Sequence, residues 1–163
     1  MTIVLFGILS CDFTQQKTSS DYWGWLIGEW TGEGSGQPGQ GGGTFVFSYD
    51  LDQKVIVRKS HSEYPGSVSK PALIHDDLMV IYSDFNGSPT KAIYFDNEGH
   101  IINYTITYSE KTIVFTSDRI PNVTVFRLTY ALLENGTVNT KFEMSQDGEQ
   151  FSTYIEGKSK KLK

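Results

Sequence analysis

Short segments of alternating character, separated by tight turns, constrain the fold of this chain more than any other feature. Tyr104 and Tyr108 belong to one face of the segment 100–108, and mostly polar residues occupy the other face. This period of two is that of a β-strand with one buried side. The Asn-Gly pair at 135–136 favours a type I′ turn, because both residues tolerate the positive φ that it needs. The pattern predicts antiparallel strands joined by hairpins.

The same pattern recurs along the chain and predicts an all-β fold. The expected strands, about ten in number, lie at residues 29–35, 44–49, 55–63, 77–83, 91–95, 100–108, 112–117, 123–132, 138–145 and 151–157. A single closed antiparallel β-barrel is favoured over a sandwich, because closure removes the exposed edges of many short strands. A short N-terminal helix at 22–27, capped by Ser20 or Asp21, is expected to plug one end.

Size and charge exclude several classes of protein. The 163 residues fit one domain, and the net charge of −5 argues against a nucleic-acid surface. The lysine-rich end at 158–163 is interpreted as a solvated tail. No apolar run is long enough for a membrane-spanning helix.

The N-terminal segment carries the single cysteine of the chain, Cys11. The apolar run 3–9, followed by Ser10 and Cys11, resembles the end of a bacterial lipoprotein signal peptide, although no Lys or Arg precedes the run. The resemblance implies a signal peptide at 1–10, a lipidated Cys11, a flexible tether at 11–21 and a barrel at 22–163. The expected location is the bacterial cell envelope, with the membrane contacted only through the lipid anchor. The alternative is a frayed or strand-forming N-terminus with a buried cysteine.

The segment 25–34 carries a second resemblance. Gly28-Glu-Trp30 is similar to the G-x-W motif of lipocalins, and Trp30-Thr-Gly-Glu-Gly34 to the start of nitrobindin-like haem barrels. The chain therefore resembles the calycins, which include lipocalins, fatty-acid-binding proteins and nitrobindins, and most of all a bacterial lipocalin-like family of unknown function. The resemblance implies structural roles for Gly28 and Trp30, with the indole closing one end of the barrel.

Two departures from the calycin pattern limit what is carried over. Lipocalins place an Arg near the chain end across the Trp, and here Lys158 or Lys160 would have to replace it. Nitrobindins bind haem iron through a His near the C-terminus, and no His follows His100 in this chain. Haem therefore stays an alternative, and no cofactor is assigned.

Aromatic residues dominate the strand faces expected to line the interior. They are Phe45, Phe47, Tyr49, Tyr104, Tyr108, Phe126 and Tyr130. They would either contact a ligand or fill the barrel as its core. Arg127 is expected outside, opposite the apolar face of its strand. The direction of Arg58 stays open; fatty-acid-binding barrels use an inward Arg and Tyr to hold a ligand carboxylate.

The histidines and carboxylates suggest no catalytic or metal centre. His61 shares a face with Val55 and Val57, so it is a candidate inward ligand or haem contact. The run 75–77, His-Asp-Asp, is interpreted as a solvated turn rather than a cation site. No nucleophile, base and orienting group can be placed together from the sequence, and no metal is expected.

The sequence thus favours non-catalytic binding of a small hydrophobic molecule by an exported, lipid-anchored barrel. Three alternatives remain: a haem or tetrapyrrole barrel of nitrobindin type, an enzyme on a calycin-like barrel, and a filled barrel acting as an interaction module of the envelope.

Overall fold

The computed structural model describes residues 22–33, 42–69, 71–84 and 87–162. Residues 1–21, with the expected signal peptide, Cys11 and tether, lie outside this range. The described residues contain ten strands: β1 (Gly28–Gly32), β2 (Gly42–Asp50), β3 (Val55–Tyr64), β4 (Leu73–Tyr82), β5 (Lys91–Asp96), β6 (Ile101–Ser109), β7 (Thr112–Ser117), β8 (Val125–Leu132), β9 (Val138–Ser145) and β10 (Ser152–Lys161).

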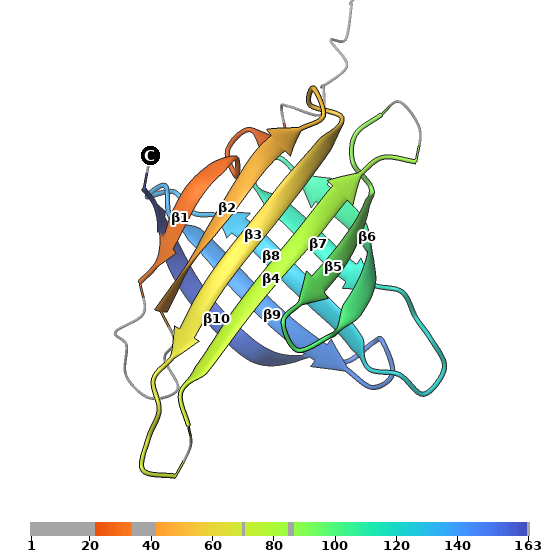
Figure 1. Ribbon diagram of the computed structural model, residues 1–163. Helices are drawn as coiled ribbons and strands as arrows, with labels where there is room; N and C mark the ends of the chain where they lie inside the picture. The colour runs from red at the N-terminus through yellow and green to blue at the C-terminus, as the bar shows by residue number, and fades with distance from the viewer. Residues whose placement is uncertain (1–21, 34–41, 70, 85–86, 163) are drawn as a thin grey trace, which may run out of the picture.

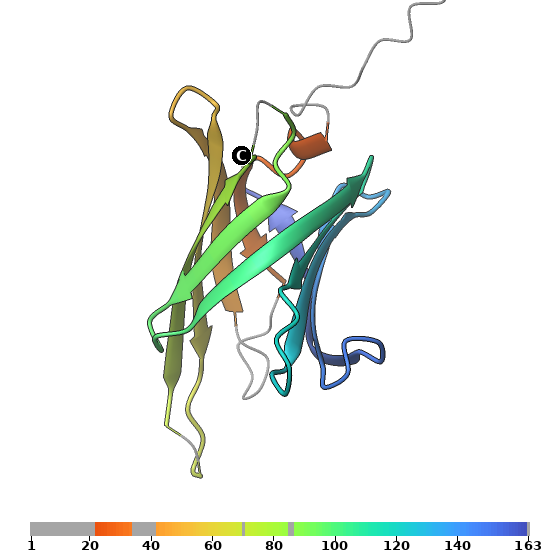
Figure 2. The same ribbon diagram turned by 90° about the vertical axis from the view of Figure 1, so that its right-hand side faces the viewer.

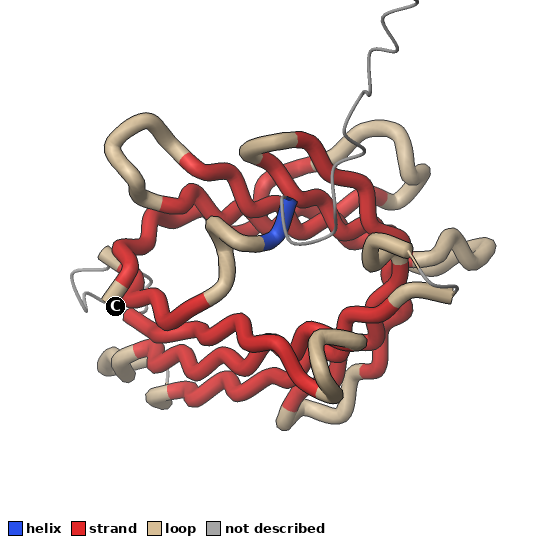
Figure 3. The backbone as a smooth tube through the Cα atoms, turned by 90° about the horizontal axis from the view of Figure 1, so that it is seen from above, coloured by secondary structure: helices blue, strands red, loops and turns tan. Residues whose placement is uncertain are grey.

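The strands form one closed barrel, as Figure 1 shows and Figure 3 shows end-on. Each strand pairs antiparallel with its neighbours in the sequence, and β1 pairs with β10, through Trp30 opposite Lys161, to close the ring. The prediction of an all-β fold with a closed antiparallel barrel of about ten strands is confirmed.

A short helical turn covers one end of the barrel, which we call the helix end (Figures 2 and 3). Of the described residues only Tyr22 and Trp23 are helical, and a turn follows. The amides of Leu26 and Ile27 both donate to the carbonyl of Trp23, at 2.9 and 3.1 Å. The helix is thus shorter than the expected 22–27, since Gly28 takes a φ of +127° and turns the chain into β1.

Two strands extend further than the sequence indicated. β4 begins at Leu73, and its pairing with β3 continues to Tyr64 opposite Leu73; the prolines at 65 and 71 are confined to the connection, where missing N–H groups cost no ladder bond. This hairpin projects from the end of the barrel opposite the helix, here called the hairpin end (Figure 1). β10 runs on to Lys161, so the lysine-rich end is a closing strand and not a free tail.

Inward and outward side chains alternate along β2 to β9, and the inward ones form the core; β10 departs from this pattern through a register shift between Thr153 and Ile155. The fully buried members include Phe47, Ile56, Met79, Phe115 and Tyr130. In the described residues no helix is both long and apolar enough to cross a bilayer.

The start of β2 approaches β3 closely. A Cβ on Gly43 would overlap the backbone oxygen of His61, whereas a Cβ on Gly42 would meet nothing within 4 Å. Glycine at 43 is therefore required by the close approach of the two backbones.

Candidate ligand-binding site

Aromatic side chains pack the half of the barrel nearest the helix end. The ring centroid of Tyr130 lies 5.3 Å from that of Phe47, 5.5 Å from that of Phe45 and 6.1 Å from that of Phe115. The pairs are tilted or edge-to-face, the arrangement that ring quadrupoles favour. This half of the interior is a packed core.

The structure places on the inner face all seven aromatic residues that the sequence assigned to the interior. Four are buried, and Tyr49, Tyr108 and Phe126 are partly buried against the core. Their role in ligand binding stays a prediction.

Apolar side chains near the hairpin end are only partly buried. Tyr94, Ile102, Phe126 and Phe142 face inward and pack against the core, yet each keeps part of its surface accessible. Tyr49 and Tyr108, nearer the helix end, are partly accessible as well. Partly accessible inner surface is therefore present toward both ends of the barrel, and the fully buried rings lie between them.

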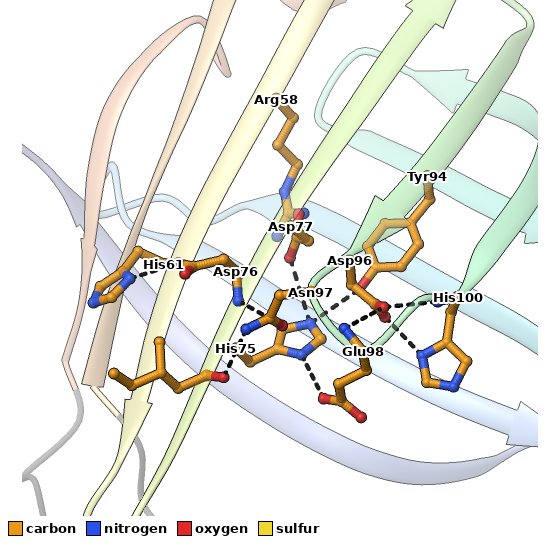
Figure 4. A network of polar contacts seen from close by, with 11 residues as sticks. Arg58, His61, His75, Asp76, Asp77, Tyr94, Asp96, Asn97, Glu98 and His100 are labelled. Atoms are coloured by element: carbon orange, nitrogen blue, oxygen red, sulfur yellow. Dashed lines mark hydrogen bonds and ion pairs between the residues drawn. The ribbon is translucent and has the colours of Figure 1, made fainter.

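Arg58, in the middle of β3, points into the barrel. Alternation with buried Ile56 sets this direction, and the side chain is only 9% exposed. Its Nη1 donates to Oδ1 of Asp77 on β4, which is 5% exposed, and Figure 4 shows the two side chains facing each other. The guanidinium carbon lies 5.9 Å from the ring centroid of Phe45 and 5.8 Å from that of Tyr130. A buried ion pair therefore lies against the aromatic core.

Six buried side-chain polar atoms have no hydrogen-bond partner among the described residues. Three belong to Trp23, Trp25 and Tyr49, and the other three are Arg58 Nε, Tyr130 Oη and Thr140 Oγ1. The side chains of Arg58 and Tyr130 are close enough to shift each other's pKa, although Tyr130 Oη and Arg58 Nε have no hydrogen-bond partner among the described residues. Thr140 is the direct cross-strand partner of Tyr130, so the two side chains face the same side. Buried polar groups are rarely left unpaired, so the unpaired atoms of the neighbouring Arg58 and Tyr130 side chains indicate a position for a polar group.

A chain of polar contacts continues from Asp77 toward the hairpin end (Figure 4). His75 Nε2 lies 3.7 Å from Asp77 Oδ2 and 2.9 Å from Tyr94 Oη, and the Tyr94 hydroxyl donates to Asp96 Oδ2 at 3.2 Å. His75, Asp77, Tyr94 and Asp96 are named the inner polar chain below. They come from β4 and β5, and the pairing of Asp77 with Asp96 sets them side by side.

Two more groups end this chain at the rim. His75 Nδ1 lies 2.9 Å from Glu98 Oε1, and His100 Nδ1 lies 2.8 Å from Asp96 Oδ2. Asp96 also accepts the backbone N–H groups of Glu98 and His100. Hydrogen bonds to His100 and to these amides hold the pKa of Asp96 below its ordinary value, against an opposing effect of burial.

His61 lies on the outer face, because it alternates with inward-facing Arg58 on β3. Its ring contacts Asp76 at 2.6 Å and Glu63 at 3.1 Å, and both partners are exposed. The hydrogen bond to Asp76 raises the pKa of His61. Arg127 also lies outside, as expected, where its Nε donates to Glu143 at 2.8 Å.

The protonation states follow from burial. Burial raises the pKa of Tyr130 to about 12, although Arg58 acts in the opposite direction. Burial also raises the pKa of Tyr94 and of Tyr104. These phenols are therefore protonated at neutral pH and can donate hydrogen bonds. Burial raises the pKa of Asp77 as well, and the contact with Arg58 opposes this rise.

These positions decide what the histidines can do chemically. His61 faces away from the interior, and both ring nitrogens of His75 already have partners. A haem iron inside the barrel would find no free ring nitrogen on either residue. Among the described residues no group of three or more His, Cys, Asp or Glu side chains is arranged to hold a metal ion.

The sequence interpretation missed the inner polar chain. His75 and Asp77 were assigned to a solvated turn, but they alternate with Met79 on β4 and share its inner face. That period of two was visible in the sequence. Their meeting with Tyr94 and Asp96 depends on the β4–β5 register, which the sequence does not specify.

The first strand carries the structural residues of the lipocalin-like motif. The indole N–H of Trp30 donates to the carbonyl of Leu26 at 2.8 Å, and the ring stacks on Phe45. Lys161 Nζ lies 5.3 Å from the Trp30 ring centroid and donates to the carbonyl of Trp25 at 3.4 Å. The cation across the Trp is thus Lys161, rather than the expected Lys158 or Lys160.

Comparison with models of known protein families gave no match, and comparison with curated proteins gave none either. The fold itself defines the class: a single closed antiparallel β-barrel of ten strands in the described residues, compatible with a calycin-like fold.

Proposed function

We propose that this barrel binds and carries a small, mainly apolar molecule without changing it chemically. The observation that carries the proposal is the partly accessible inner surface near the hairpin end, formed by Tyr94, Ile102, Phe126 and Phe142. A concave apolar surface with a few convergent polar groups is the usual form of a ligand site. Here the polar groups are the buried Arg58–Asp77 pair and its unpaired neighbours.

The first test is binding of a neutral fluorescent probe, 1-aminoanthracene, to the full-length protein. Ile102 points inward near the hairpin end, and its neighbour Ile101 points outward and is exposed. Ile102→Trp adds bulk to the inner surface and should weaken probe binding about tenfold or more. Ile101→Trp adds the same bulk outside and should leave binding unchanged.

The two variants separate the interior from the surface as the binding location. Equal weakening, or no weakening, in both would place the probe elsewhere and refute binding inside the barrel. Absence of any saturable probe binding, together with a bare mass in native mass spectrometry, would instead support the filled barrel that acts through its surface.

Export and lipid anchoring are part of the proposal, supported by the apolar run 3–9 that precedes Ser10 and Cys11. Expressed in a bacterium and fed a labelled fatty acid, the full chain should incorporate the label and partition into detergent. Cys11→Ser should do neither. Equal labelling of the variant would show that Cys11 is not the site of lipid attachment, and the proposal of ligand binding would still stand.

A further inference from the structure

The Arg58–Asp77 pair determines which polar group a ligand can carry. We infer that the site takes an apolar molecule with a neutral hydrogen-bond acceptor, such as a ketone, ester or ether oxygen, and discriminates against a carboxylate. This inference rests on the proposed function and specifies the ligand class for the same interior.

The first argument is the local charge. Arg58 would be a strong partner for a carboxylate if its charge were free, but Asp77 already contacts it from the adjacent strand. The inner polar chain adds a second carboxylate, Asp96, whose side chain is also buried. A ligand carboxylate at Arg58 would therefore meet a guanidinium that is already paired with Asp77, with Asp96 acting on Asp77 from the next strand.

The second argument is the chemistry of the unpaired atoms. Arg58 Nε carries a hydrogen and can only donate. The Tyr130 hydroxyl is protonated, because its pKa lies far above neutral pH, and it can donate as well. The Thr140 hydroxyl can donate or accept. A ligand atom that satisfies Arg58 Nε or Tyr130 Oη must therefore accept hydrogen bonds, which an ammonium group cannot do.

The third argument is the surrounding medium. Phe45 and Tyr130 flank the guanidinium, and Leu128 lies two residues before Tyr130 on the same face of β8. Moving an ionised carboxylate into such surroundings costs far more than moving a carbonyl, unless a free opposite charge compensates. A neutral oxygen avoids this cost and still satisfies the unpaired donors.

The experiment uses two competitors of nearly the same shape, 2-undecanone and decanoate, which differ by a methyl group in place of a charged oxygen. Each displaces bound 1-aminoanthracene from the wild-type protein at neutral pH. The ketone should bind about tenfold or more tightly than the acid. Tyr130→Phe and Arg58→Met should each weaken the ketone about three- to tenfold relative to a plain hydrocarbon measured in the same variant, the effect of one hydrogen bond.

Asp77→Asn is the decisive variant, because it releases the charge of Arg58 without changing the side-chain shape. Decanoate should then gain about tenfold in affinity and overtake the ketone. Asp76→Asn, the adjacent change on the outer face, should alter neither affinity. If Asp77→Asn does not fold, the double variant Arg58→Met with Asp77→Leu removes both charges; it should lose any preference for the ketone over a plain hydrocarbon.

The outcomes separate the two proposals. Tighter binding of decanoate than of 2-undecanone by the wild-type protein would overturn this inference and leave the proposed function standing. Ketone binding that is insensitive to Tyr130→Phe and Arg58→Met would mean that the unpaired atoms hold only water, which also overturns it. If the probe does not bind at all, the proposed binding of an apolar molecule is refuted, and this inference, which rests on it, is refuted as well.

Discussion

The unpaired hydroxyl of Tyr130 leads to a quantitative prediction: Tyr130→Phe should make the ligand-free protein more stable. The residue is fully buried and its Oη has no partner among the described residues. Burying a donor without a partner costs about 1 to 3 kcal/mol, and removal of the oxygen recovers that cost while the ring keeps its packing. For a domain of this size the melting temperature should rise by about 2 to 12 °C.

The same chemical change at Tyr94 should have the opposite sign. The Tyr94 hydroxyl is within hydrogen-bond distance of His75, at 2.9 Å, and donates to Asp96 at 3.2 Å. Tyr94→Phe should therefore lower the free energy of unfolding by about 1 to 2 kcal/mol.

Urea unfolding followed by tryptophan fluorescence measures both variants, because Trp23 and Trp30 are buried and report on the barrel interior. The midpoint should move up for Tyr130→Phe and down for Tyr94→Phe, with similar slopes. A loss of stability in both variants would refute the reasoning, since it would show that the Tyr130 hydroxyl is satisfied in solution.

Further predictions concern the barrel wall and its surface. Gly43→Ala should lower the free energy of unfolding by about 1 to 3 kcal/mol through overlap with β3, while Gly42→Ala, with nothing near its Cβ, should change it little; equal effects would contradict the close approach. The pKa of His61, followed by NMR, should lie above its ordinary value and fall in Asp76→Asn. The stabilising effect of this contact is present at low pH and is lost as the pH rises through the raised pKa of the folded state; an unchanged pKa in the variant would reject it. Trp30→Phe leaves a buried carbonyl without its donor and should cost about 1 to 3 kcal/mol, measured by the same urea unfolding; no loss would show that the hydrogen bond is dispensable.

The strands could be predicted because their alternation is local. The face of β6 that carries Tyr104 and Tyr108 could be assigned to the interior because the opposite face is mostly polar. In β3 both faces begin with apolar residues, Val55 and Val57 on one and Ile56 on the other, so the sequence did not decide which face is inner. That ambiguity placed His61 on the wrong side and left Arg58 open.

The inner polar chain depends on information that a single strand does not contain. His75 and Asp77 are separated from Tyr94 and Asp96 by a hairpin, and only the register of β4 against β5 brings them together. The extension of β10 was missed for another reason: a lysine-rich segment resembles a solvated end unless its partner strand is known. The pairing of Lys161 with Trp30 supplies that partner.

The pairing of the first strand with the last also governs how the chain can fold during synthesis. β1 leaves the ribosome long before its partner β10 has been made. Until β10 emerges, the growing sheet has two unpaired edges, at β1 and at the newest strand, and such edges pair readily with other chains. A premature stop near residue 150 would therefore produce an open sheet prone to aggregation, rather than a smaller working barrel.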